Sequence, residues 1–282
     1  MALIRPFRLF ILAAVSGLLV SCGGGGSEVQ VRPGLYAGSR WIIGFDLLSP
    51  LYQLLWTDDG EVWIADSINL NGSAGYFAHG RLSPVGRVGD QVSFRSTMGW
   101  ASIDSGILSP ATLSAKATID PSEGTVRYFE VASPTLYPYE ALWRERTDPA
   151  PIPTNDYRST FDYDRPAEVS ELARTWISTL GQSSPMVTLR TDSAGGFEGA
   201  NAVTGCAFSG KFTPHASGKN IFSVRFSLSA CPDSVGEYAG VAYVFRQPQI
   251  VMQGQPGGFT NLKILAMRAD RARAFHLNLA PE

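Results

Sequence analysis

The stretch FSVRFSLS, residues 222–229, alternates apolar and polar side chains at every step. Because successive side chains of a β-strand point to opposite faces, a strand with this sequence has one apolar face and one polar face. Such a strand is typical of an antiparallel sheet that covers a core with one side only. Residues 113–119 alternate in the same way. The sequence therefore predicts antiparallel β structure.

Turn-forming residues separate the predicted strands. Gly, Asn, Asp and Pro gather in short segments at residues 58–60, 69–72, 86–89, 217–218 and 256–258. With 17% charged residues and 29 glycines, the composition excludes a coiled coil and a highly charged disordered chain. About seven short strands in each half, with little helix between them, indicate an up-and-down sheet that closes into a small barrel or rolls up tightly. Closure would remove exposed sheet edges.

One motif occurs twice in the chain. GYFAHGRLSP at residues 75–84 and GCAFSGKFTP at residues 205–214 both read G-x-x-x-x-G, basic, apolar, hydroxyl, Pro. A turn that contains Asp and Gly precedes each copy, at residues 58–60 and 192–195. The shared order and spacing indicate an internal duplication, so that the same fold is used twice.

A Pro-rich run separates the two copies. We expect residues 31–147 to form one β domain, residues 148–156 a stiff linker and residues 157–282 a second β domain. Residues 166–174 begin with Pro, carry early acidic residues and place Val169 and Leu172 on one face, which predicts a short amphipathic helix at the start of the second domain. The predicted fold class is all-β, with two tandem, internally repeated antiparallel β-barrel-like or rolled-sheet domains.

The first 22 residues have the pattern of an export signal. Arg5 and Arg8 precede an apolar run at residues 9–20 that is too short to span a bilayer. The sequence LVSC at residues 19–22 resembles the lipobox of bacterial lipoproteins. The resemblance implies that residues 1–21 are a signal peptide and that Cys22 is acylated, followed by a Gly-rich tether through residue 30. An ordinary signal peptide with a chance Cys is the alternative.

The lipobox and the strand-and-glycine pattern of each half together resemble the β-rich outer-membrane lipoproteins of proteobacteria, and more loosely the META-type envelope lipoproteins. In similar enterobacterial lipoproteins, a residue other than Asp after the lipidated Cys favours sorting to the outer membrane, and here that residue is Gly23. The resemblance thus implies a lipid-anchored outer-membrane protein, facing either the periplasm or the cell surface. It supplies no catalytic residues.

Two cysteines remain after Cys22. Cys206 and Cys231 form an even pair in a chain that is expected in an oxidising compartment, which favours a disulfide. The bridge would close a loop of about 26 residues and stabilise the fold by about 3 to 4 kcal/mol from loop entropy. A metal pair and a reactive thiol are the alternatives, but neither a C-x-x-C spacing nor an adjacent His supports them.

Sequence motifs of enzymes and metal sites are missing. His79, His215 and His276 form no H-E-x-x-H motif, and we interpret them as surface histidines. The chain has no G-x-S-x-G, S-x-x-K, Walker or G-x-G-x-x-G motif. Residues 58–59 and 162–164 carry acidic pairs that we interpret as turn caps rather than calcium ligands. We therefore expect no catalytic residues, no metal, no cofactor and no enzymatic activity.

Tryptophans gather in the first half of the chain. Trp56 alternates with Leu54 and is expected in the core, whereas Trp63 and Trp100 are less constrained. If these two rings are exposed, they could stack on a sugar or bind a protein partner. The alternative is that they fill a barrel interior.

The charge limits the choice of partner. A formal net charge of −2 leaves no basic footprint for DNA or RNA, and the basic residues 268–273 include Asp270, which favours a solvated turn. We expect a non-enzymatic cell-envelope lipoprotein, held to the membrane by its N-terminal lipid, that binds an envelope protein or glycan through its loops. The alternative is a carrier of a small apolar ligand inside one barrel, which would need an interior lined by small side chains.

Overall fold

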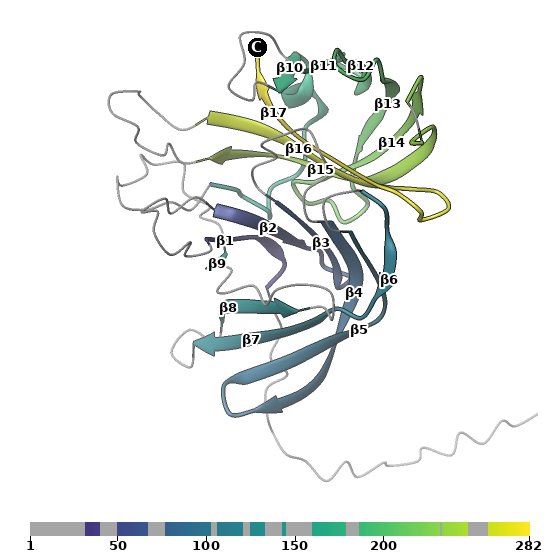
Figure 1. The fold of residues 1–282 in the computed structure, drawn as a ribbon. Helices are drawn as coiled ribbons and strands as arrows, with labels where there is room; N and C mark the ends of the chain where they lie inside the picture. Colours follow the sequence, from purple (N-terminus) through teal and green to yellow (C-terminus); the bar gives the residue numbers. More distant parts are fainter. Residues whose placement is uncertain are drawn as a thin grey trace, which may run out of the picture.

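The computed structural model describes residues 32–39, 50–66, 77–102, 106–120, 125–132, 143–144, 160–178, 186–231, 233–247 and 259–282. The signal peptide, Cys22, the tether, Trp41 and the linker at 148–156 lie outside these residues. Within them the chain consists almost entirely of strands (Figure 1), and no helix there has the length and apolar character to cross a membrane. The prediction of an all-β fold is confirmed.

The first half is a rolled antiparallel sheet. Its strands are β1 (Gly34–Ser39), β2 (Pro50–Trp56), β3 (Glu61–Asp66), β4 (Phe77–Val88), β5 (Gln91–Ser102), β6 (Ser109–Ala111), β7 (Ser114–Asp120), β8 (Thr125–Ala132) and β9 (Trp143–Arg144). They follow the order β8-β7-β5-β4-β3-β2-β1-β9, and β6 pairs with β5. The sheet curls until Cα atoms of its two end strands, β8 and β9, come within 8 Å of each other.

The second half is a closed barrel. Its strands are β10 (Thr175–Ser178), β11 (Val187–Thr191), β12 (Gly196–Asn201), β13 (Ala207–Pro214), β14 (Phe222–Ser229), β15 (Gly236–Gln247), β16 (Phe259–Arg268) and β17 (Ala274–Pro281). Each strand pairs antiparallel with the next, and β10 pairs with β17 to close the barrel. Of the two predicted architectures, the rolled sheet occurs in the first half and the barrel in the second.

Aromatic rings fill the barrel interior. Along β14 the burial alternates as the sequence predicts, with every second side chain pointing inward. The interior includes the fully or nearly fully buried side chains of Trp176, Phe197, Phe208, Phe212, Phe222 and Phe226. Eight strands give a barrel just wide enough for its own side chains to fill.

The duplicated motif has the same geometry in both halves. Gly60 and Gly195 end the β2–β3 and β11–β12 turns with φ of 79° and 82°, a left-handed conformation that favours Gly. The carbonyl oxygen of Gly60 accepts a hydrogen bond from the Leu82 N–H at 2.9 Å, and that of Gly195 accepts one from Phe212 at 2.8 Å. The two turns therefore define equivalent positions in the two halves, with Gly60 matching Gly195.

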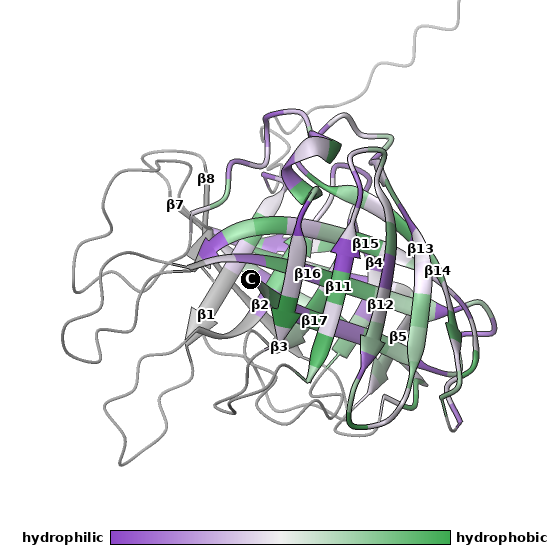
Figure 2. Ribbon diagram, turned by 90° about the horizontal axis from the view of Figure 1, so that it is seen from above, coloured by the Kyte–Doolittle hydropathy of each residue, from purple (hydrophilic) through white to green (hydrophobic). Residues whose placement is uncertain are grey.

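An apolar layer joins the two halves. The outer face of the first-half sheet supplies Leu35, Leu55, Trp63, Ala65 and Phe77 to this layer. The outer face of the barrel supplies Val241, Tyr243, Phe245, Leu265 and Met267. Seen from above, the barrel strands lie over the first-half strands (Figure 2). The halves thus share a core instead of touching only through a linker.

The predicted helix at residues 166–174 is shorter than expected. Only Val169–Leu172 is helical, as a single 3-10 turn named η1. Leu172 is fully buried in the barrel core, and its carbonyl oxygen accepts a hydrogen bond from Trp176 Nε1 at 3.0 Å. Because β10 begins at Thr175, the chain leaves the helical conformation after one turn.

Cys206 and Cys231 form the predicted disulfide. Cys206 directly precedes β13, and Cys231 lies just after the end of β14. The bond therefore ties the two open ends of this hairpin together, on a pair of neighbouring antiparallel strands.

Candidate functional site

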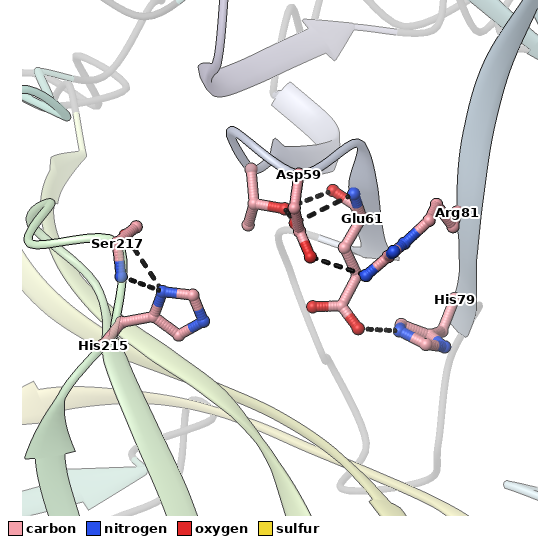
Figure 3. A network of polar contacts seen from close by, with 7 residues as sticks. Asp59, Glu61, His79, Arg81, His215 and Ser217 are labelled. Carbon is pink, nitrogen blue, oxygen red and sulfur yellow. Dashed lines mark hydrogen bonds and ion pairs between the residues drawn. The ribbon is translucent and has the colours of Figure 1, made fainter. Parts of the chain in front are cut away.

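Polar side chains cluster at the β2–β3 turn of the first half (Figure 3). Thr57 Oγ1 donates to Asp59 Oδ1 at 2.5 Å, and Arg81 Nη2 donates to Asp59 Oδ2 at 2.6 Å. Partial burial disfavours the charged form of Asp59, but these hydrogen bonds and the charge of Arg81 outweigh burial and lower its pKa. Asp59 Oδ1 also accepts the Glu61 N–H at 3.3 Å, so this carboxylate caps the turn.

A carboxylate–imidazole pair lies next to this turn. His79 Nε2 is 2.7 Å from Glu61 Oε1, and both side chains are half-buried. Burial alone would raise the pKa of Glu61, but the hydrogen bond and the charge of His79 outweigh it and lower this pKa. The imidazole ring also lies against Trp63, with ring centroids 4.0 Å apart. His79 is therefore held in place on two sides.

The connector, residues 160–165, fastens the β2–β3 turn to the barrel. Tyr163 Oη donates to Asp58 Oδ2 at 2.8 Å. Burial and the neighbouring Asp58 carboxylate raise the pKa of Tyr163, which keeps the phenol protonated as a donor. On the other side, Asn220 Nδ2 donates to the Asp162 carbonyl oxygen at 2.8 Å. The first half, the connector and the barrel are thus linked by consecutive hydrogen bonds.

Asp164 lies at the exposed end of the connector. Arg32 Nη2 and Lys219 Nζ donate to its two carboxylate oxygens at 3.0 and 3.1 Å. Burial raises the pKa of Asp164, but the hydrogen bonds and charges of these two cations together outweigh it and lower this pKa. Asp162 Oδ1 accepts the Asp164 N–H at 3.2 Å, so that Asp162 caps this turn while Asp164 contacts the two cations.

His215 belongs to the β13–β14 turn of the barrel. Its Nδ1 lies 2.9 Å from Ser217 Oγ and also accepts the Ser217 N–H at 3.2 Å. Figure 3 shows this turn across from the Glu61–His79 pair. Each of these two histidines is bound within its own half.

The two tryptophans considered as candidates for an exposed binding surface lie in other environments. Trp63 is only 4% exposed and belongs to the apolar layer between the halves, so its ring is not available to a partner. Trp100 is half-buried against the same layer, and the guanidinium of Arg271 lies 5.7 Å from its ring centroid. Neither ring fills the interior of its own sheet. Both sit on the outer face, which the barrel covers.

His276 is also not on the surface, contrary to the sequence interpretation. It is 6% exposed, and its Nε2 has no hydrogen-bond partner. Burial, helped by the positive charge of Lys263, lowers the pKa of His276 to about 3. A pattern of alternating residues identifies the outer face of β17, but it does not show that another layer covers that face.

The basic segment at residues 268–273 forms the β16–β17 turn and contacts the first half. Arg268 makes two hydrogen bonds to the Asp270 carboxylate, at 2.9 and 2.8 Å. The Leu108 N–H donates to the Ala272 carbonyl oxygen, and the Ala274 N–H donates to Gly106. The segment thus has a structural role in joining the two halves.

A shallow, open groove of about 600 Å³ lies on the outside of the barrel. Arg190, Asp192, Glu198 and Ser209 line it. Its floor is the face of β11–β13 that is equivalent to the covered face of β2–β4. In the described part of the chain, no group of three His, Cys, Asp or Glu residues is arranged to hold a metal ion.

No protein-family model, curated protein or solved structure matches this chain.

Proposed function

We propose that this chain is a non-enzymatic lipoprotein of the bacterial outer membrane that binds an envelope protein or glycan through the turns of its β units. Cys22 would carry the lipid, and the folded body would present its turns to the partner. The lipobox-like sequence and the Cys206–Cys231 disulfide support this location, because disulfides persist in exported proteins.

The placement of the exposed apolar side chains is the main support for binding through the turns. Val88, Val203 and Val235 are all more than half exposed, and they lie in or beside the β4–β5, β12–β13 and β14–β15 turns, respectively. Val85 and Met98 are also more than half exposed but lie within strands β4 and β5. Exposed apolar groups at loops that a rigid scaffold positions are a common arrangement for recognition.

The barrel interior gives no support to the alternative of an apolar-ligand carrier. Phe197 and Phe212 lie with ring centroids 4.5 Å apart, and Phe226 and Phe275 at 4.8 Å. Rings in such contact occupy the space that a ligand would need. Recognition is therefore assigned to the outside of the molecule.

Cell fractionation tests the lipid anchor. Wild-type protein is expected in the membrane pellet with an acylated Cys22, identified by mass spectrometry of the mature N-terminus. The Cys22→Ala variant is expected to lose the acyl chains and leave the membrane fraction. Membrane retention of this variant at the wild-type level would contradict the anchor.

Site-specific photo-crosslinking in growing cells tests binding through the turns. A photoreactive residue at position 203 or 235 is expected to give adducts with an envelope protein or glycan. Positions 211 and 225 are matched controls, because they are exposed but lie within barrel strands. Equal adduct yields at turn and strand positions would contradict recognition by the turns.

A further inference from the structure

The β4–β5 hairpin extends past the β2–β3 turn of the first half. Glu61, the first residue of β3, pairs with Arg81, and β4 continues for seven residues past this point to Val88. Seven residues of strand extend about 23 Å. On its other side, β5 pairs with β7 from its first residue, Gln91, to Arg95, so β7 lies beside the hairpin up to its tip.

The tip of this hairpin is exposed and partly apolar. All residues from Ser83 to Gln91 are exposed. Val85 and Val88 are 61% and 83% exposed, the latter the largest value among the exposed large apolar side chains of the described residues. Arg87 Nε donates to the Gly89 carbonyl oxygen at 2.9 Å, so that this cation lies beside the two valines. The tip thus combines apolar side chains with a basic one.

The chain enters the first half at the rim from which the hairpin projects. Gly34, the first residue of β1, pairs with Trp56, the last residue of β2, next to the β2–β3 turn. This turn marks the rim that β4 extends past. Cys22 precedes Gly34 by twelve residues, a length that reaches at most about 40 Å when extended. An anchor at Cys22 therefore holds this rim, and with it the hairpin, close to the bilayer.

We propose that the tip of the β4–β5 hairpin inserts into the bilayer surface that holds the Cys22 lipid, with Val85 and Val88 at the level of the headgroup–acyl boundary and Arg87 at the phosphates. This inference rests on the lipid anchor of the proposed function. The partner of this turn is then the membrane itself. Amphipathic elements that place apolar groups below basic ones bind anionic membrane surfaces in this way.

The size of the tip favours a membrane over a protein as its partner. A stable protein interface buries about 800 Å² on each partner. The apolar part of this tip consists of two valines next to Pro84. A lipid surface needs no complementary pocket to accept these side chains. The lipid at Cys22 would supply most of the affinity, and the hairpin a second contact that orients the body.

Lipid quenching of a fluorescent label tests the insertion. The full lipidated protein with Val88→Cys carries one free thiol, because Cys206 and Cys231 are bonded and Cys22 is acylated in the proposed mature form. The labelled protein is reconstituted into vesicles of phosphatidylethanolamine and phosphatidylglycerol that contain brominated acyl chains. Val203→Cys is the matched control, since Val203 is 69% exposed in the β12–β13 turn. Figure 1 shows β12 and β13 at the opposite end of the view from the β4–β5 hairpin.

The expected result is a severalfold stronger quenching of the label at position 88 than at position 203. Equal quenching at the two positions, in protein whose Cys22 lipid is present by mass spectrometry, would overturn the hairpin insertion and leave the lipid anchor intact. Absence of the lipid from protein purified from the membrane would overturn both the proposed anchor and the inference. A melting curve of each labelled variant that matches wild type shows that the fold is retained.

Discussion

The two halves of the chain share a hairpin geometry but use its outer face in opposite ways. In the first half this face carries Leu55, Trp63 and His79, and the barrel covers it. The equivalent positions in the second half carry Arg190, Glu198 and Ser209, which line an open groove. One copy therefore uses the outer face as an interface, whereas the other leaves it to solvent. The barrel contributes to the interface through a different part of its outer face, on β15 and β16.

The inner faces differ as well. Val62 and Ala78 line the rolled sheet, whereas the equivalent Phe197 and Phe208 fill the barrel. At these two positions the closed eight-stranded barrel has the bulkier side chains, whereas the aromatic rings of the rolled sheet lie elsewhere, at Tyr36, Trp56 and Phe94. Substitutions at equivalent positions of the two halves can therefore be compared directly.

The largest effect is expected at Trp63. Trp63→Ala would leave a cavity in the shared apolar layer and lower the free energy of unfolding by about 3 to 5 kcal/mol. At the equivalent exposed position, Glu198→Ala is expected to change it by less than about 0.5 kcal/mol. Urea denaturation of the two variants measures both values. Similar losses at the two positions would mean that the outer faces are not used differently.

A smaller effect is expected at the central glycine of the repeated motif. An added Cβ at Gly210 would lie 2.2 Å from the Arg225 carbonyl oxygen, and Gly210→Ala should cost about 3 kcal/mol through overpacking. The equivalent Gly80 meets the end of the Leu113 side chain at 3.0 Å, and Gly80→Ala should cost about 1 kcal/mol because this side chain is able to move. Thermal denaturation compares the two variants. A larger loss at Gly80 would contradict the tighter packing of the barrel.

The histidines of the two halves predict a pH dependence. His79 has Glu61 as a hydrogen-bond partner, whereas His276 is buried and its pKa is lowered to about 3. Below a pH of about 6.5 the unfolded chain binds a proton at His276, whereas the folded chain does not. The free energy of unfolding therefore falls by about 1 kcal/mol for each unit by which the pH is lowered. Denaturation between pH 6.5 and 5, above the range in which carboxylates titrate, measures this slope. His276→Gln is expected to flatten it, and an unchanged slope in this variant would rule out His276 as its source.

The sequence predicts the strands, the repeat and the disulfide because these follow from local pattern and spacing. The alternation at residues 222–229 and the matched turns at Gly60 and Gly195 appear in the structure as expected. The sequence does not predict the burial of Trp63. An alternating pattern distinguishes the two faces of a strand, but it does not show whether a second layer of the protein covers the outer face. The available signal was the repeat itself, in which Trp63 matches Glu198. When one of two equivalent outer positions is apolar and the other is charged, the apolar side chain is expected to be covered by another part of the protein.

We predict that the two halves unfold as one cooperative body, because they share an apolar layer. Urea unfolding can be followed by two measurements in parallel. Tryptophan fluorescence reports mainly on the first half, because only Trp176 lies in the second. Hydrogen exchange of peptides from β14 to β16 reports on the barrel. Coincident midpoints are predicted, because loss of either half exposes the layer that stabilises the other. Two separate midpoints, one for each half, would contradict the claim.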